Sequence, residues 1–345
     1  MRLLLTGHLG YLGAVMAPML VSRGHEVVGL DSGLFEACAF QEPSARLEAI
    51  TKDIRDVQAT DLRGFEAVVH LAGLSNDPLG NLLPELTLEI NHRATVRLAG
   101  LAKEGGVSRF LFSSTCSVYG AAGEHMVTEA SAPHPVTAYG RSKVLAEEGL
   151  RDLADAGFSP TILRSATASG VSPYLRFDLV LNNLVAWATA TGAVRLKSDG
   201  TAWRPLVHVE DIARTYCGVL DAPRDTVHNQ TINVGLDSEN YRILDLAEIV
   251  QRTVPGARIE FASNASTDQR CYRVGFGKLA KLLPSCQLQW SAARGAQQLY
   301  HALSRAKVGL AEFEGDRYRR IVHAKRLLET GQLDATLRWA HRELG

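Results

Sequence analysis

The sequence predicts an α/β fold, a doubly wound parallel sheet with helices on both faces, followed by a smaller α/β part. Short apolar runs alternate with helical patterns through the first half of the 345 residues. The first of these runs leads directly into a glycine-rich turn. Alternation of this kind is typical of parallel strands joined by right-handed helical crossovers.

The apolar patterns give the order of the elements. In the first half, the expected strands are residues 3–5, 27–30, 47–51, 67–71, 110–113 and 160–163, and the expected helices are about 11–23, 84–104 and 138–156. In the second half, strand-like runs near 194–196, 206–209, 231–234 and 258–261 are separated by helical patterns near 178–191, 210–221 and 242–253.

These patterns divide the chain into three parts. Residues 1–170 form the expected main domain, to whose sheet later segments return, and 171–315 form a smaller layer over the carboxyl edge of that sheet. Residues 316–345 are an appended tail with a charged, helical pattern. Its expected packing residues are Ile321, Leu327, Leu328, Leu333, Leu337 and Trp339.

The glycine-rich turn has the spacing Gly7-His-Leu-Gly10-Tyr-Leu-Gly13 and follows the first strand. Gly7 lets the chain turn sharply, Gly10 lets a pyrophosphate approach the backbone, and Gly13 lets the helix pack closely on the strand. The helix N-terminus offers free N–H groups to the phosphates. The turn therefore indicates a Rossmann-type, dinucleotide-binding domain, and the alternative is a glycine-rich turn without a ligand.

Asp31 stands at the end of the second expected strand, in Gly24-His-Glu-Val-Val-Gly-Leu-Asp31. A carboxylate at this point of the fold accepts hydrogen bonds from the adenosine ribose and repels the additional phosphate of NADP. We therefore expect NAD as the cofactor. A plain turn residue at the strand end is the alternative.

Composition narrows the class of protein. The chain is 46% hydrophobic and carries 37 basic and 37 acidic side chains, which argues against nucleic acid or an anionic membrane as the main partner. No apolar run reaches transmembrane length, and the chain begins with a core strand, so we expect neither a membrane span nor a signal peptide. Five cysteines without metal-like spacing favour reduced thiols, a cytoplasmic location and no metal site.

Two stretches carry side chains suited to proton and hydride chemistry. Tyr139-Gly-Arg-Ser-Lys143 places a phenol and an ammonium one helical turn apart, and the ammonium favours the phenolate. Upstream, a strand ends in a run of hydroxyls that includes Thr115, which could donate to a substrate oxygen. Taken singly, these are a surface helix pair and a strand-end turn. Together, behind the glycine-rich turn, they favour a catalytic site.

The chain resembles the extended short-chain dehydrogenases/reductases of the NAD-dependent epimerase/dehydratase type, which act on nucleotide sugars. The resemblance covers about residues 1–300. It implies that Thr115, Tyr139 and Lys143 are catalytic. It implies an NAD-binding first domain with the cofactor residues Gly7, Leu9, Gly10, Tyr11, Leu12, Asp31, Ser32, Asp53, Ile54, Leu71, Ala72, Gly73, Asn91 and Ser113, together with Tyr139 and Lys143.

The resemblance also implies a nucleotide-sugar substrate bound mainly by the second part of the chain. The expected substrate residues are Ser75, Thr115, Tyr139, Thr167, Asn182, Asn183, Arg204 and Arg270. An arginine fork suits phosphate recognition. Many members of the family are homodimers, and we expect one here through helices 84–104 and 138–156.

Two departures from the family pattern bear on the reaction. The 4,6-dehydratases carry Asp-Glu after the catalytic threonine, where this chain has Cys116 and Ser117, and related decarboxylases keep a Glu at the second position. Cys116 is interpreted as a small packing residue. Thr167 replaces an Asn that commonly contacts the sugar nucleotide.

The sequence therefore favours an NAD-dependent nucleotide-sugar epimerase acting at C4. Tyr139 would remove the C4 hydroxyl proton, and a transient keto sugar would form on the enzyme. A one-way ketosugar reductase or dehydrogenase is the main alternative. A dehydratase and a non-catalytic NAD-sensing protein are more distant ones.

Overall fold

The computed structural model describes residues 1–75, 77–123, 125–266 and 270–340. Within these residues the central sheet has seven parallel strands in the order β11-β7-β5-β4-β1-β2-β3. Its strands are β1 (Arg2–Thr6), β2 (Glu26–Asp31), β3 (Glu48–Thr51), β4 (Ala67–His70), β5 (Arg109–Thr115), β7 (Ser159–Ser165) and β11 (Thr231–Val234). The strand order reverses between β1 and β4, which is where such sheets bind ligands.

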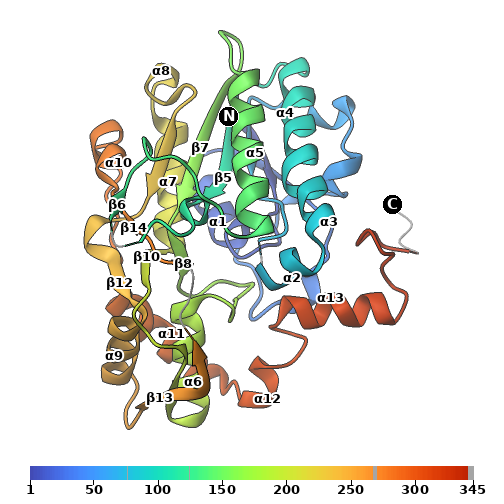
Figure 1. Ribbon diagram of the computed structural model, residues 1–345. Helices are drawn as coiled ribbons and strands as arrows, with labels where there is room; N and C mark the ends of the chain where they lie inside the picture. Colours follow the sequence, from blue (N-terminus) through green and yellow to red (C-terminus); the bar gives the residue numbers. More distant parts are fainter. Residues whose placement is uncertain (76, 124, 267–269, 341–345) are drawn as a thin grey trace.

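Helices cover both faces of this sheet (Figure 1). α1 (Gly13–Ser22) and α7 (Val209–Asp221) pack on one face, and α4 (Ala94–Glu104) and α5 (Ala138–Leu153) pack on the other. Neighbouring strand residues point to opposite faces, so Leu3 and Leu5 join the first helical layer and Leu4 joins the second. This arrangement confirms the predicted doubly wound α/β fold.

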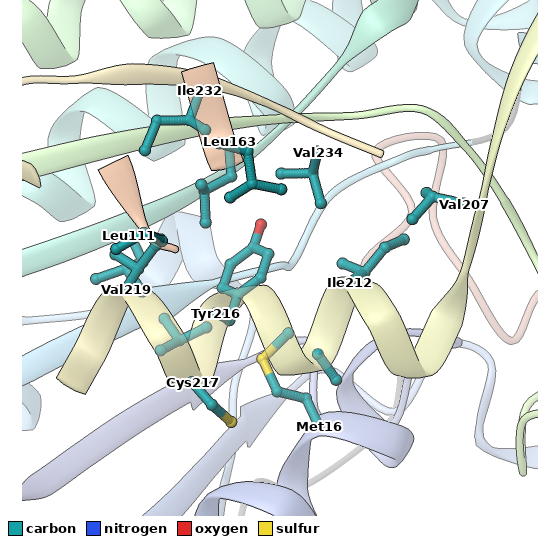
Figure 2. Close-up of a cluster of buried hydrophobic side chains, with 14 of the residues drawn as sticks. Met16, Leu111, Leu163, Val207, Ile212, Tyr216, Cys217, Val219, Ile232 and Val234 are labelled. Carbon is teal, nitrogen blue, oxygen red and sulfur yellow. The ribbon is translucent and has the colours of Figure 1, made fainter. Parts of the chain in front are cut away.

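The core beneath α1 and α7 is tightly filled (Figure 2). Tyr216 and Ile212 of α7 and Met16 of α1 are fully buried against strand residues such as Leu163 and Val234. α7 and β11 lie within residues 171–315 in sequence, yet they complete the first sheet and one of its helical layers.

The helix expected over 84–104 is divided. It comprises α3 (Pro84–Leu88), a π-helical turn η4 (Glu89–Arg93) and α4. The wider turn carries Asn91, whose side chain is fully buried. Isolated π-helical turns inside helices are frequent next to functional sites.

The second part of the chain has its own core. Buried residues of α6 (Val180–Thr191), α9 (Ile243–Thr253) and α11 (Ala292–Ala306) pack together. It lies below the sheet in Figure 1, beyond the end of β7. Its strand groups are β9 (Ala193–Ser198) with β13 (Arg258–Ser266), β8 (Thr167–Ser169) with β10 (Trp203–His208) and β12 (Asn240–Arg242), and β6 (Met126–Val127) with β14 (Arg273–Val274).

The shorter helices lie between these elements. They are α2 (Asp77–Leu82), α8 (Arg224–Val227), α10 (Gly277–Leu282) and α12 (Leu310–Phe313). No helix in the described ranges is both long and apolar enough to cross a membrane.

The tail is helical over a shorter stretch than expected. Only α13 (Arg320–Glu329) is a helix, and the following turns are closed by a bridge between Leu333 and Trp339. Leu327, Leu333 and Leu337 are buried in the same cluster as Leu34 of the first domain. Trp339 and Leu328 pack at its edge and Ile321 is half-buried. The last predicted tail residues, 341–345, lie outside the described residues.

A buried ion pair joins α5 to the sheet below the carboxyl end of β5. Arg164 on β7 donates from Nε and Nη2 to the carboxylate of Glu147 on α5, at 2.9 and 2.6 Å. Ser114 of β5 donates to the same carboxylate at 2.6 Å, and Arg164 Nη1 donates to the hydroxyl of Tyr119 at 3.0 Å. Both charged side chains are at most 3% exposed.

Removing Glu147 should destabilise the fold because it leaves the buried charge of Arg164 without its carboxylate. We expect Glu147→Ala to lower the free energy of unfolding by about 3–5 kcal/mol. The neighbouring Glu148 is exposed, and Glu148→Ala should change it by less than about 0.5 kcal/mol. Urea denaturation of the three proteins measures both effects. Equal stability of the two variants would contradict this account.

Candidate active site

One large cavity of about 1170 Å³ follows the carboxyl edge of the sheet. The β1–α1 turn, the ends of β2, β4 and β5, the start of α5 and the second part of the chain all contribute to its wall. The expected site residues that line it are Gly7, Leu9, Gly10, Tyr11, Leu12, Asp31, Ser32, Asp53, Ile54, Leu71, Ala72, Gly73, Ser75, Ser113, Thr115, Tyr139, Lys143, Thr167, Asn183, Arg204 and Arg270. Residues far apart in the sequence thus meet around one cavity.

The glycine-rich turn is packed backbone against backbone. Gly7 has a φ of +75°, and a Cβ there would lie 2.8 Å from the backbone nitrogen of Ala72. A Cβ at Gly13 would lie 2.2 Å from the carbonyl oxygen of Gly7. No side chain caps the start of α1. The turn therefore leaves its backbone and the helix N-terminus open to the cavity, which fits a dinucleotide pyrophosphate.

Asp31 lies beside this turn at the end of β2. Its carboxylate accepts hydrogen bonds from the backbone nitrogens of Leu9 (3.2 Å) and Gly33 (2.9 Å). Burial raises the pKa of this carboxyl, and the two N–H donors oppose that shift. Held in this way at the cavity wall, Asp31 is placed to accept from a ribose hydroxyl, so the residues present fit NAD.

Asp53 and Ile54 line the same end of the cavity. Asp53 begins a short turn and pairs with Arg55 at 2.6 Å, a contact that holds the pKa of the Asp53 carboxyl below its usual value against the effect of burial. Ile54 is 5% exposed and packs in the core below the turn.

Thr115, Tyr139 and Lys143 come from two adjacent elements. Thr115 ends β5, and Tyr139 and Lys143 lie one turn apart at the start of α5, whose first turn is capped by Thr137 through a 3.1 Å hydrogen bond from Gly140. Lys143 is 4% exposed, and its Nζ lies 5.8 Å from the centre of the Tyr139 ring.

Burial lowers the pKa of Lys143 to about 7, while the nearby Glu147 opposes this shift. Its Nζ donates to the carbonyl oxygen of Ser113 at 2.8 Å. In its protonated form Lys143 favours the phenolate of Tyr139, because opposite charges at close range stabilise each other in a low-dielectric site. This arrangement suits Tyr139 as a general base or acid, with Thr115 as a hydroxyl donor on the same wall.

Two expected site residues do not line the cavity. Asn91 is fully buried and holds the loop after β4, accepting from Leu74 N at 2.8 Å and donating to Leu74 O at 2.9 Å. Asn182 is also fully buried, accepts from Gly170 N at 3.0 Å and donates to Arg176 O at 2.9 Å. Both side chains hold the backbone of loops that line the cavity. Asn91 and Asn182 could therefore influence a ligand only through the residues that they position.

Arginines of the second part of the chain line the cavity. Arg204 is 6% exposed, donates to the carbonyl oxygens of Trp203 and Arg270, and lies 5.5 Å from the centre of the Tyr272 ring. Asn183 lines the cavity near the start of α6 and donates to Phe177 O at 2.7 Å. The guanidinium of Arg204 therefore meets the backbone of Arg270, and both residues line the cavity.

The cavity also contains residues that sequence reasoning missed. Arg176 pairs with Asp178 at 2.5 Å and donates to Ser75 Oγ and O at 2.9 and 3.0 Å, so Ser75 is already engaged. This Arg-Phe-Asp segment precedes the expected asparagine pair, a position that could have drawn attention to it. Arg320 of α13 lines the cavity too, and its distance from the other motifs along the chain gave no signal.

Cys116 points away from the cavity. It is fully buried, and its thiol donates to the carbonyl oxygen of Arg164 at 3.2 Å. Burial raises the pKa of this thiol above its usual value. Its burial agrees with the packing role expected from the sequence.

The position of Asp31 predicts the cofactor preference. NAD should bind much more tightly than NADP, because the buried carboxylate would face the ribose phosphate of NADP. Asp31→Ala should narrow the gap between the two dissociation constants, measured by calorimetric titration of each nucleotide. Equal affinities in the wild-type protein would overturn this prediction.

Comparisons with known proteins agree with this geometry. A model of the NAD dependent epimerase/dehydratase family matches residues 3–235. The chain is 27% identical over 330 residues to a UDP-glucose 4-epimerase of Bacillus subtilis, covering 87% of this chain and 94% of that protein. It is also 27% identical over 300 residues to UDP-glucuronic acid decarboxylase 1 of Arabidopsis thaliana, covering 84% and 66% of the two chains.

A solved structure supports the cofactor. MoeE5 in complex with UDP-glucose and NAD matches with a TM-score of 0.76 and 26% identity, covering 89% of this chain and all of that one (100%). The expected cofactor, NAD, is thereby confirmed. With the family model matching well over half of its residues, this chain belongs to the NAD-dependent epimerase/dehydratase family.

Proposed function

We propose that the protein is a nucleotide-sugar epimerase that inverts the configuration at C4 of the sugar. The observation that carries the proposal is the meeting of Thr115, Tyr139 and Lys143 at the wall of the cavity that the cofactor turn also lines, where Cys116 and Ser117 follow Thr115 in place of carboxylates. The UDP-glucose 4-epimerase among its relatives supports this choice over other activities of the family.

The carboxylates of the cavity argue against a dehydratase. Among the described lining residues they are Asp31, Asp53, Asp178 and Glu314. Asp31 and Asp53 belong to the adenosine end. Asp178 is paired with Arg176, which holds its pKa below the usual value, and Glu314 is paired with Arg319 at 3.0 Å. Cys116 and Ser117 follow Thr115, so neither an acid nor a base of carboxylate type stands there.

The chain's own residues supply the proton chemistry. Tyr139, in the phenolate form that Lys143 stabilises, removes the proton of the C4 hydroxyl and becomes the neutral phenol, and Thr115 donates to the sugar oxygen. Bound NAD supplies hydride acceptance and return at C4. In the second half of the reaction Tyr139 returns a proton to the oxygen. The keto sugar must turn in the cavity between the two halves, so that its other face is reduced.

The arginines of the cavity wall give the proposed substrate its anchor. Arg204, Arg270 and Asn183 would hold the nucleotide and its diphosphate, because guanidinium forks match phosphate oxygens. A UDP-sugar is the proposed class, since the UDP-glucose 4-epimerase and the MoeE5 complex both concern UDP-glucose. Thr167 lies on the same cavity wall and would adjust the fit of the sugar.

A one-way ketosugar reductase or dehydrogenase remains the second candidate, because it would use the same three residues. It differs in cofactor turnover, since it must exchange the dinucleotide after each reaction. A decarboxylase is disfavoured because Ser117 occupies the position at which those relatives usually have a Glu. A non-catalytic NAD sensor would have no need for the complete set of Thr115, Tyr139 and Lys143.

We expect a substrate deuterated at C4 to keep its label in the epimerised product, because the hydrogen removed from the carbon is returned to it without leaving the site. Added NAD should be needed only in catalytic amounts or not at all. C4-deuterated UDP-glucose is incubated with the enzyme, with and without added NAD. Mass spectrometry and NMR of the product then measure the retained label and the dependence on NAD. Stoichiometric consumption of added NAD or NADH with one net product would instead establish a dehydrogenase or reductase.

The Tyr139→Phe variant tests the base in the same assay. Removing a general base typically costs about 10² to 10⁴ in rate, and here the base also begins the hydride step. Turnover should fall by at least that range, while NAD affinity should stay nearly unchanged. A variant that keeps wild-type turnover would exclude Tyr139 as the base.

We also propose that the protein is a cytoplasmic homodimer. The proposed contact is the outer surface of α4 and α5, which lie side by side (Figure 1) and include the exposed Leu145. Light scattering at micromolar concentration should give twice the mass of one chain, and Leu145→Glu should shift the protein toward the monomer. A wild-type protein of single-chain mass would contradict the dimer.

A further inference from the structure

The C-terminal segment 310–340 crosses the adenosine side of the cavity. In Figure 1 it runs from α12, beside α6 of the second part, along α13 to the neighbourhood of α2. Phe313, Glu314, Arg319, Arg320 and Ile321 line the same cavity as the cofactor turn. The tail is therefore part of the wall of the cofactor site.

Specific contacts hold the tail against the loop that follows Asp31. Trp339 Nε1 donates to Ser32 O at 2.8 Å, and His323 Nε2 donates to Leu34 O at 3.1 Å. Arg317 donates to Ala39 O from Nε and Nη2, at 3.1 and 2.9 Å. This loop begins at Asp31, the residue expected to bind the ribose. The hydrogen bonds therefore connect the tail directly to the loop that adjoins the expected cofactor site.

Arg320, the first residue of α13, is unusual among the buried cations. It is 9% exposed, stacks over the ring of Phe35 at 4.7 Å, and its Nη2 has no hydrogen-bond partner among the described residues. Burial and, to a smaller extent, the charge of Arg176 lower the pKa of this guanidinium to about 10, while Asp178 and Asp31 oppose the shift. A buried guanidinium without a partner is costly unless an anion completes its hydrogen bonds.

We propose that Arg320 donates to a phosphate oxygen of the bound dinucleotide, so that the C-terminal segment fastens NAD in its groove. The inference rests on the NAD dependence of the family and is independent of the sugar reaction.

The neighbouring groups favour the dinucleotide as the source of the anion. The carboxylate of Asp31 accepts from Leu9 N and Gly33 N, and that of Asp178 pairs with Arg176, so these two carboxylates are already engaged. The pyrophosphate is the anion that the cofactor brings to the turn beside Asp31. The guanidinium fork is also the side chain best suited to phosphate oxygens.

The test compares Arg320→Met, Arg320→Lys and a control, Lys325→Met. Methionine keeps the apolar contact with Phe35 and removes the charge, whereas lysine keeps the charge and loses the fork. Lys325 is exposed on the same helix, so its variant removes the same charge away from the cavity. Calorimetric titrations of nucleotide-free full-length protein with NAD, ADP-ribose and UDP give the dissociation constants.

We expect Arg320→Met to weaken binding of NAD and ADP-ribose about equally, by about ten- to a hundredfold, the range usual for a lost charge-assisted hydrogen bond. Arg320→Lys should recover part of the loss, and Lys325→Met should stay within about twofold of the wild type. UDP affinity should not change. The melting temperature of the nucleotide-free Arg320→Met protein should not fall, since the variant removes a buried charge whose Nη2 has no hydrogen-bond partner among the described residues.

Hydrogen exchange gives a readout that does not depend on affinity. NAD should slow amide exchange across residues 320–329 in the wild type and much less in Arg320→Met. Unchanged NAD affinity in Arg320→Met, a loss confined to UDP, or a lower melting temperature of the nucleotide-free variant would each overturn the proposal. Unchanged NAD affinity would show that Arg320 does not bind the cofactor. A loss confined to UDP would assign Arg320 to the substrate, and a lower melting temperature would give it a structural role.

Discussion

The hydrogen bond from Lys143 Nζ to the carbonyl oxygen of Ser113 joins α5 to the end of β5, and the candidate active site depends on it. Thr115 lies two residues beyond the acceptor and Tyr139 one helical turn before the donor, so the bond sets how the hydroxyl and the phenol face each other. The buried Glu147–Arg164 pair, one turn further along α5, secures the same helix to β7. The chemistry at the cavity wall therefore rests on a helix fixed at successive turns to adjacent strands.

A second constraint is the pairing of buried charge. Arg55 meets Asp53, Arg164 meets Glu147 and Arg176 meets Asp178, and each pair lies in or directly behind the wall of the cavity. These pairs hold loops in place without leaving a charge unsatisfied in a low-dielectric region. Arg320 departs from this pattern, because its Nη2 has no hydrogen-bond partner within the part of the chain that the structure describes, and the proposed phosphate would supply one.

The residues that follow Thr115 bear on the proposed reaction. An elimination or decarboxylation needs an acid or base beside the sugar, and after Thr115 the chain offers a buried thiol and a hydroxyl. Cys116 donates into the backbone of β7 and is closed off from the cavity. Oxidation and return of hydride at one carbon needs only the phenol, the ammonium and the hydroxyl donor. These side chains are therefore the ones on which the proposed epimerisation depends.

The sequence alone determined the sheet and the cofactor end of the site, because both depend on local signals. Strands and helices differ in the spacing of their apolar residues, which the sequence displays directly. A glycine is required where a Cβ would meet the backbone of Gly7 or Ala72. Tyr139 and Lys143 share a helix face because they are four residues apart. What depends on packing between distant segments could not be obtained this way. Asn91 and Asn182 match motifs, yet their amides satisfy backbone groups behind the wall, and only the fold decides which way a side chain faces.

The contacts of the C-terminal tail could not be predicted from the sequence either. Its apolar residues predicted a packed helix, but the position of Arg320 beside Asp31 arises from contacts across nearly 290 residues of chain, such as that of His323 with Leu34, for which no local pattern exists.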